Sequence, residues 1–239
     1  MGIARTGLSA LIVTLAVSFM TTACSHGVDS DYRERAWERF TVNGERALSD
    51  QRYDIAASAF DSAVDQSRQS GDNSVRLAES LSNVGWALMK AGKTTRATSV
   101  LQECDHLCDQ LLAHPDNTGL ALSLVRVRVQ TTLAECERIS GHPDQALPHF
   151  RKALEIFQQS KFPSDYGYGA IGEVVTVAYS GLGDSLMATN KPIEALDAYR
   201  LAAETSDITP GRLSLKDAAR EKYVLMLQKL KPELSNKLR

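Results

Sequence analysis

The fold is indicated most clearly by the sequence GHPDQALPHFRKALEIF, residues Gly141 to Phe157. It opens with Gly-His-Pro, a combination that ends one helix and begins another. Behind it, Ala146, Phe150 and Ala153 follow each other at offsets of four and three, which puts all three on one face of a helix. Small residues on that face let a neighbouring helix approach closely, and the aromatic ring fills the remaining space. The stretch therefore predicts a tight turn and then a closely packed helix.

The same pattern occurs four times with identical offsets, and in each copy another small residue stands twelve positions before the first alanine. The copies are Gly44, Ala56, Phe60, Ala63; Gly85, Ala97, Leu101, Cys104; Ala134, Ala146, Phe150, Ala153; and Gly183, Ala195, Tyr199, Ala202. Helix-stop and helix-start residues separate the two halves of each copy. A repeat of this length indicates a solenoid built from antiparallel helix pairs.

Two segments, Gly141 to Phe157 and LGDSLMATNKPIEALDAYRLA from Leu182 to Ala202, resemble the tetratricopeptide repeat (TPR) family most closely. The first alanines of the copies are 41, 49 and 49 residues apart, whereas the family period is about 34. In this respect the chain resembles the extended repeats of kinesin light chains and of bacterial peptide-sensing regulators. The resemblance implies an all-α, right-handed superhelix of about four antiparallel helix pairs.

The four repeats are expected within residues 31–212, at about 31–70, 74–113, 119–160 and 170–207. Residues 213–239 are expected to form a capping helix and tail, because a solenoid needs a polar outer face at its end. We expect Val224, Leu227 and Leu230 to cover the last repeat. The alternation of valine and arginine from Val125 to Val129 favours a strand locally. It lies inside a repeat, however, and we predict a helix there.

The first 23 residues are expected to be a signal peptide of the lipoprotein type. Arg5 precedes an uncharged segment from Leu8 to Met20, which is too short to span a bilayer. Ala23-Cys24 then resembles the bacterial lipoprotein signal, although Thr21 stands where that signal usually has leucine. The resemblance implies lipidation of Cys24, with residues 24–30 as a tether. An ordinary cleaved signal and an uncleaved anchor remain alternatives. Ser25 in place of aspartate implies the periplasmic face of a bacterial outer membrane.

Three further cysteines leave several interpretations open. Cys104 and Cys108 are one helical turn apart, and Cys136 belongs to the next predicted helix. They can be buried small hydrophobic residues. In an exported protein, Cys136 can instead form a disulfide with Cys104 or Cys108. Metal binding is the weakest interpretation, because His106 points away from the two cysteines.

Two stretches of the sequence partly match nucleotide-binding motifs. Gly167, Gly169 and Gly172 spell G-x-G-x-x-G, but a helix tail ending in Pro163 precedes them, where a dinucleotide site needs a strand. We interpret these glycines as part of a connector. The stretch ALMKAGKT, Ala87 to Thr94, lacks the first glycine of a phosphate-binding loop. No catalytic constellation, metal motif or cofactor motif is found, and the sequence favours a protein that is not an enzyme.

A net charge of −2 argues against a nucleic-acid partner, and nothing indicates a small-molecule substrate. In the TPR family the first helix of each repeat lines a concave groove that holds a protein segment. The resemblance implies the following groove residues: Glu45, Asn83, Trp86, Met89, Lys90, Arg128, Glu135, Arg138, Asp184 and Met187. Trp86 is the expected anchor for an apolar side chain, with burial between repeats as the alternative. An acidic group of the partner is expected near Arg128 and Arg138.

These features predict a membrane-tethered lipoprotein that acts as a scaffold or adaptor for an envelope assembly. Lipoproteins with such repeats include the pilotins of type IV pilus secretins and adaptors of envelope hydrolases. The alternative is a peptide-sensing module that changes conformation when a ligand enters the groove.

Overall fold

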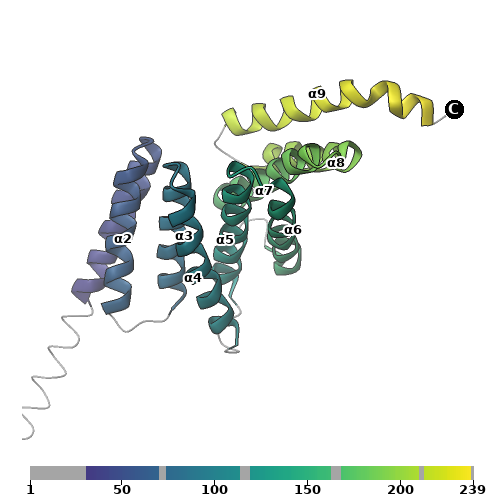
Figure 1. Cartoon of the computed structure of the whole chain (residues 1–239). Coiled ribbons are helices and arrows are strands. Elements are labelled where there is room, and N and C mark those ends of the chain that lie inside the picture. The colour runs from purple at the N-terminus through teal and green to yellow at the C-terminus, as the bar shows by residue number, and fades with distance from the viewer. Residues whose placement is uncertain (1–30, 70–73, 114–118, 163–167, 210–212, 238–239) are drawn as a thin grey trace, which may run out of the picture.

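A computed structural model describes residues 31–69, 74–113, 119–162, 168–209 and 213–237 of the 239-residue chain. These residues form nine helices and no strand (Figure 1), which confirms the all-α fold. An N-terminal helix covers residues 31–49. The others are α2 (Tyr53–Gln69), α3 (Val75–Lys90), α4 (Thr94–Leu112), α5 (Leu120–Ile139), α6 (Pro143–Ser160), α7 (Tyr168–Ala188), α8 (Pro192–Asp207) and α9 (Leu213–Lys237).

The helices are stacked in chain order as antiparallel pairs. Each helix from α2 onward contacts the next one along the chain, and α5 also contacts α3 on one side and α7 on the other (Figure 1). The first helices of successive repeats therefore form one continuous layer. Such nearest-neighbour stacking is the architecture of a helical-repeat superhelix.

The turn inside each repeat has the same backbone in all four copies. One residue per turn adopts the left-handed conformation, namely Gln51, Gly92, Gly141 and Asn190, with φ between 58° and 86°. The following residue donates its N–H to a carbonyl five positions earlier, as Lys93 does to Leu88 at 2.9 Å and Lys191 to Leu186 at 2.8 Å. This arrangement satisfies carbonyls at the end of the first helix.

The recurrent small residues permit the close approach of the two helices in a pair. A methyl group added at Gly183 would lie 2.5 Å from Cε1 of Tyr199, and one at Gly85 would overlap the Leu101 side chain. Gly44 stands in the same relation to Phe60. In these three repeats the glycine of the first helix thus faces the bulky residue of its own repeat, which explains why the two positions recur together.

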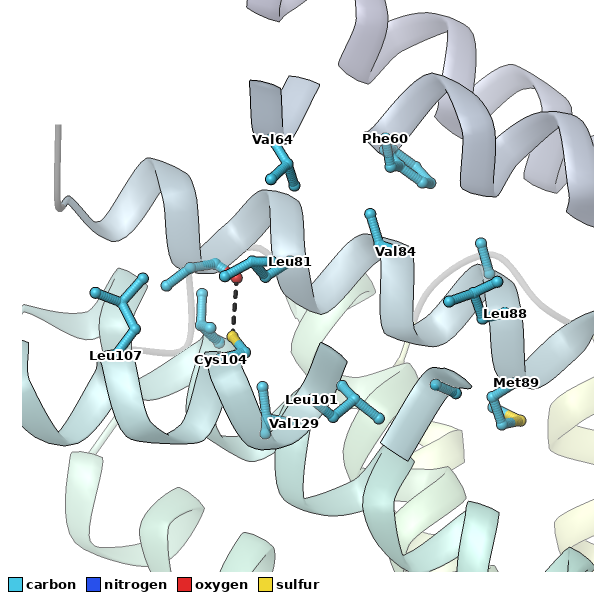
Figure 2. Packing of buried hydrophobic residues seen from close by; sticks show 14 of the residues in the cluster. Phe60, Val64, Leu81, Val84, Leu88, Met89, Leu101, Cys104, Leu107 and Val129 are labelled. Carbon is cyan, nitrogen blue, oxygen red and sulfur yellow. Dashed lines mark hydrogen bonds between the residues drawn. The ribbon is translucent and has the colours of Figure 1, made fainter. Parts of the chain in front are cut away.

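The core runs through the interior of the stack. Phe60, Val84, Leu88 and Leu101 are at most 1% exposed and fill the space between α2, α3 and α4 (Figure 2). A second set of buried residues, including Phe150 and Ile171, joins α5, α6 and α7. Within the described ranges, no helix combines the length and the hydrophobicity required to cross a bilayer.

Two local expectations meet different outcomes. The valine–arginine alternation lies within α5, so its prediction as helix is confirmed. The predicted buried face of α9 is wrong in part: Leu230 is buried, but Val224 and Leu227 are exposed. The face that covers α8 contains Ala219, Met226 and Leu230, whose offsets of seven and four place them on one side of the helix.

Candidate functional site

A cavity of about 430 Å³ opens between the first helices of the four repeats, and we call it the concave cavity. This volume lies in the range of about 300–1,000 Å³ that is typical of ligand sites. The lining residues come from the N-terminal helix (Glu45, Leu48), α2 (Phe60), α3 (Asn83, Trp86, Lys90), α5 (Arg128), α7 (Glu173, Val174, Val177) and α9 (Ser214, Leu215, Ala218).

Five of the ten residues proposed for the groove line this cavity. They are Glu45, Asn83, Trp86, Lys90 and Arg128. They come from three helices that lie far apart in the sequence, and the structure brings their side chains to one cavity. The repeat spacing predicts that each of these residues lies on the first helix of its repeat. Because the first helices lie side by side around the cavity, these residues meet there.

Arg128 is a part-buried cation in the wall of the concave cavity. Its Nη1 donates a hydrogen bond to Oδ1 of Asn83 at 2.6 Å. Burial lowers the pKa of the guanidinium, and the nearby carboxylates of Glu79, Glu45 and Glu173 act in the opposite direction. Because an arginine side chain stays charged in proteins, the surrounding carboxylates compensate a permanent positive charge.

Trp86 is half-buried beside this cation. Its ring packs against the core cluster on one side and lines the concave cavity on the other. The ammonium of Lys90 lies 4.7 Å from the ring centroid, within the range of a cation–π interaction. Trp86 therefore combines the two environments proposed for it, since it is packed between helices and also reaches the cavity.

Glu135, Arg138 and Asp184 form a separate ionic cluster at the junction of α5, α7, α8 and α9. Arg138 donates to both carboxylate oxygens of Glu135, at 3.2 and 2.6 Å, and lies 3.9 Å from Asp184. This pairing raises the pKa of Arg138. Asp184 also accepts hydrogen bonds from Tyr199 at 2.9 Å and from Lys222 of α9 at 2.8 Å. The charges of Glu135, Arg138, Asp184 and Lys222 are therefore paired with one another, and their bonds connect α5, α7 and α9.

Met89 and Met187 do not reach the concave cavity. Met89 is 5% exposed and belongs to the core, and Met187 packs against the cluster that joins α8 and α9. Their expected place in the groove is therefore corrected. Met89 follows Leu88 in the sequence, and both belong to the buried cluster that also contains residues of α2 and α4.

The three cysteines after the tether are buried free thiols in the structure, and the disulfide pairing is therefore not the arrangement observed. Cys104 donates to the carbonyl of Ala78 at 3.1 Å (Figure 2). Burial raises the pKa of Cys136 to about 11. Such thiols behave as small hydrophobic residues. Within the described residues, no group of histidine, cysteine and carboxylate side chains is arranged to hold a metal ion.

One glycine of the G-x-G-x-x-G string, Gly172, has a packing role that the sequence did not indicate. Gly167 lies outside the described residues, but Gly169 and Gly172 belong to α7 and not to a connector. A methyl group at Gly172 would overlap the Thr209 side chain just after α8. Gly172 is thus explained by close contact between two segments, and the described element that precedes α7 is the helix α6, where a dinucleotide site would require a strand.

The cavity also has lining residues that the sequence did not indicate. Glu173 and Val174 lie near the start of α7, and Ser214, Leu215 and Ala218 lie in the first turns of α9. The sequence places these residues on helices, but that α7 and α9 face the same cavity depends on how whole repeats pack. The only sequence feature that pointed toward the lining residues of α9 was the predicted terminal helix over the last repeat.

No protein-family model matches the chain, and the curated proteins contain no significant match. Solved structures do resemble it. The apo form of RapI matches with a TM-score of 0.58 at 16% identity, over 82% of this chain and 49% of that one. This chain thus spans about half of RapI. BtubC (BKLC) from P. vanneervenii gives a TM-score of 0.56 at 13% identity, over 90% of each chain.

A structure described as the "Podosopora anserina putative kinesin light chain nearly identical TPR-like repeats" gives a TM-score of 0.56 at 14% identity. It covers 87% of this chain and 91% of that one. At these identities the likeness concerns the fold alone. Together with the stacked helices of the described ranges and the recurrent turns, it shows that the chain has the TPR-like helical-repeat fold.

Proposed function

We propose that the protein is a non-enzymatic scaffold that binds a segment of a protein partner in the concave cavity. The observation that carries this proposal is the cavity itself. It is lined by the first helices of all four repeats and combines apolar walls with a few polar groups, which is the usual composition of a binding site. The half-buried Trp86 offers a rigid aromatic anchor of the kind enriched at binding hot spots.

The test is capture of the partner from solubilised envelopes by wild-type protein and by Trp86→Ala. We expect the substitution to weaken capture by about 2 kcal/mol or more, because it removes the aromatic wall while helicity is retained. Ile193→Ala, at an exposed position of α8, is the matched control and should capture normally. Wild-type capture by Trp86→Ala would exclude the concave cavity as the binding site.

We further propose that the scaffold is tethered to the periplasmic face of a bacterial outer membrane through a lipid on Cys24. This residue lies outside the described residues, and the proposal rests on the lipoprotein-like sequence before it. Metabolic labelling with a palmitate analogue should mark the wild type and not Cys24→Ala. Label that persists in the variant, or recovery of the protein in the inner membrane, would contradict the tether or its location.

A tethered scaffold of this kind would serve an envelope assembly, as a pilotin or a hydrolase adaptor does. One observation favours peptide sensing as a second candidate. The first turns of α9 form part of the cavity wall, so an occupant would touch the terminal helix directly. Hydrogen exchange in α9 that changes on partner binding would support sensing, and unchanged exchange would favour a passive scaffold.

A further inference from the structure

The first repeat leaves open the face by which each later repeat packs on its predecessor. In the second, third and fourth repeats, the first helix contacts the second helix of the preceding repeat, which is α2, α4 or α6. Figure 2 shows this seam for the second repeat, where Val84 of α3 lies opposite Phe60 and Val64 of α2. Among the described helices, none precedes residues 31–49, so none covers the equivalent face of the first repeat (Figure 1).

A groove of about 590 Å³ lies on this open face, between the N-terminal helix and α2, and we call it the end groove. Its lining residues Phe40 and Asn43 are in register with Leu81 and Val84, which are at most 3% exposed in the seam. The lining residues of the end groove and of the concave cavity do not overlap. The end groove is therefore a separate surface, at the place where a preceding repeat would pack.

Two residues of the end groove are polar where the second repeat is apolar. Asn43 and Arg46 are exposed, and they stand in register with Val84 and Ala87, which have no exposed surface. A terminal repeat needs polar groups on its outer face to stay soluble when nothing covers it. The first repeat is therefore suited to a state in which the end groove is open.

Ile55 departs from the repeat in the opposite direction. It is 53% exposed, whereas the polar residues Arg96, Gln145 and Glu194 occupy the same exposed position in the later repeats. Ile55 lines the end groove together with Phe40, and exposed apolar groups that gather in a groove are typical of an interaction site. A surface in contact with water alone would carry a polar residue here, as the other repeats do, so Ile55 favours a surface that a partner covers.

Arg46 adds a charge to the edge of the end groove. Arg52, the other arginine of the lining, is bonded to Asp50 at 2.6 Å. Asp54, the carboxylate of the lining, is paired with Lys93 at 2.8 Å. Within the described residues, no carboxylate lies within ion-pair distance of Arg46. An acidic side chain of an occupant can therefore pair with Arg46 without breaking an existing ion pair.

We infer that the end groove is a second docking site, which binds an amphipathic helix of a protein partner. The internal seams define how such a helix lies, because α2, α4 and α6 each occupy the equivalent place beside the following repeat. The bound helix directs aliphatic or small side chains, spaced by three or four residues, toward Phe40 and Ile55. A carboxylate on its flank pairs with Arg46. This site is independent of the concave cavity and goes beyond the proposed function.

The probes are two synthetic peptides, acetylated and amidated, that copy α2 and α6. A side-chain bridge on the outer face of each peptide holds the helix, because isolated helices of this length are marginally stable. Calorimetry measures their binding to the full-length protein. Ile55→Asp should weaken the binding of both peptides about tenfold or more, since it removes an apolar contact. Ile193→Asp, at an exposed position of α8 outside the groove, is the matched control and should bind normally.

Arg46→Gln tests the charged contact. The α2 peptide carries three aspartates and one arginine, whereas acidic and basic side chains are equal in number in the α6 peptide. The substitution should weaken binding of the α2 peptide about threefold and leave binding of the α6 peptide nearly unchanged. Equal effects on the two peptides would overturn the assignment of an acidic group beside Arg46.

The remaining outcomes decide whether a partner helix is the occupant. If neither peptide binds, or if Ile55→Asp binds both as the wild type does, the end groove does not accept a helix and the inference is wrong. A dimer of the protein alone that Ile55→Asp converts to a monomer in sedimentation would assign the groove to a second copy and overturn the inference. Peptide binding that requires removal of residues 1–30 would assign it to the chain's own N-terminal segment, with the same consequence. Circular dichroism checks that the helices of each variant are intact.

Discussion

At the scale of single residues, the stack depends on small side chains where helices cross. Ala195 has no exposed surface and lies in the cluster that joins α8 to α7 and α9. Ala195→Leu should lower the free energy of unfolding by about 1–3 kcal/mol, because the added carbons have no space between the helices. Urea unfolding followed by circular dichroism measures the change.

The control for this prediction lies on the same helix. Ile193 is 47% exposed, so Ile193→Leu should alter the free energy of unfolding by less than about 0.5 kcal/mol. If Ala195→Leu also unfolds at the wild-type urea concentration, the alignment of the fourth repeat is wrong at this position.

At the scale of elements, the four turns differ in how well their residues suit one shared backbone. Gly92 and Gly141 adopt the left-handed conformation without strain, whereas Gln51 and Asn190 carry side chains there. Gln51→Gly should therefore stabilise the first repeat. Relief of the backbone strain raises the free energy of unfolding by up to about 1 kcal/mol, and the greater entropy of glycine in the unfolded chain offsets part of this gain.

The reciprocal substitution tests the same backbone from the other side. Gly92→Ala should destabilise the second turn, although no atom lies near the added methyl group. Thermal melting of the two variants should thus move in opposite directions. If both variants melt at a higher temperature than the wild type, backbone strain does not distinguish these two turns.

The elements also show how far sequence reasoning reaches. Small and bulky residues at fixed offsets predicted the helix pairs, because contacts within a pair depend on local spacing. The valines of α5 were correctly assigned to a helix because the repeat outweighed their local alternation. Met89 was misplaced because its spacing of three from Trp86 puts both residues on one side of α3. In the structure Met89 is buried in the core, whereas Trp86 is only partly buried and lines the cavity. The contribution of α9 to the cavity was beyond such reasoning, because it depends on the curvature of several repeats.

At the scale of the whole molecule, the two halves of the core should unfold separately when one is weakened. Phe150 is fully buried between α5, α6 and α7, and Phe150→Ala should cost about 3–5 kcal/mol. Both tryptophans, Trp37 and Trp86, lie in the first two repeats. In this variant, circular dichroism should therefore begin to change at a lower urea concentration than tryptophan fluorescence.

Phe60→Ala provides the matched comparison, because Phe60 occupies the same repeat position in the first helix pair and is also buried. Here fluorescence should change together with circular dichroism or before it. Coincident transitions in Phe150→Ala would show that the array unfolds as one cooperative unit.

The position of α9 has a mechanical consequence. An open helical array behaves as a spring, since small rotations at each contact between neighbours add up along its length. The first turns of α9 line the same cavity as Glu45 and Phe60 of the first repeat, while Lys222 is bonded to Asp184 of the last. Among the described helices, α9 contacts mainly α8 and, to a smaller extent, α7 (Figure 1). It therefore braces the last repeat, and stretching the array there would have to separate α9 from both helices, so this end should be stiffer in extension than the stack that precedes it.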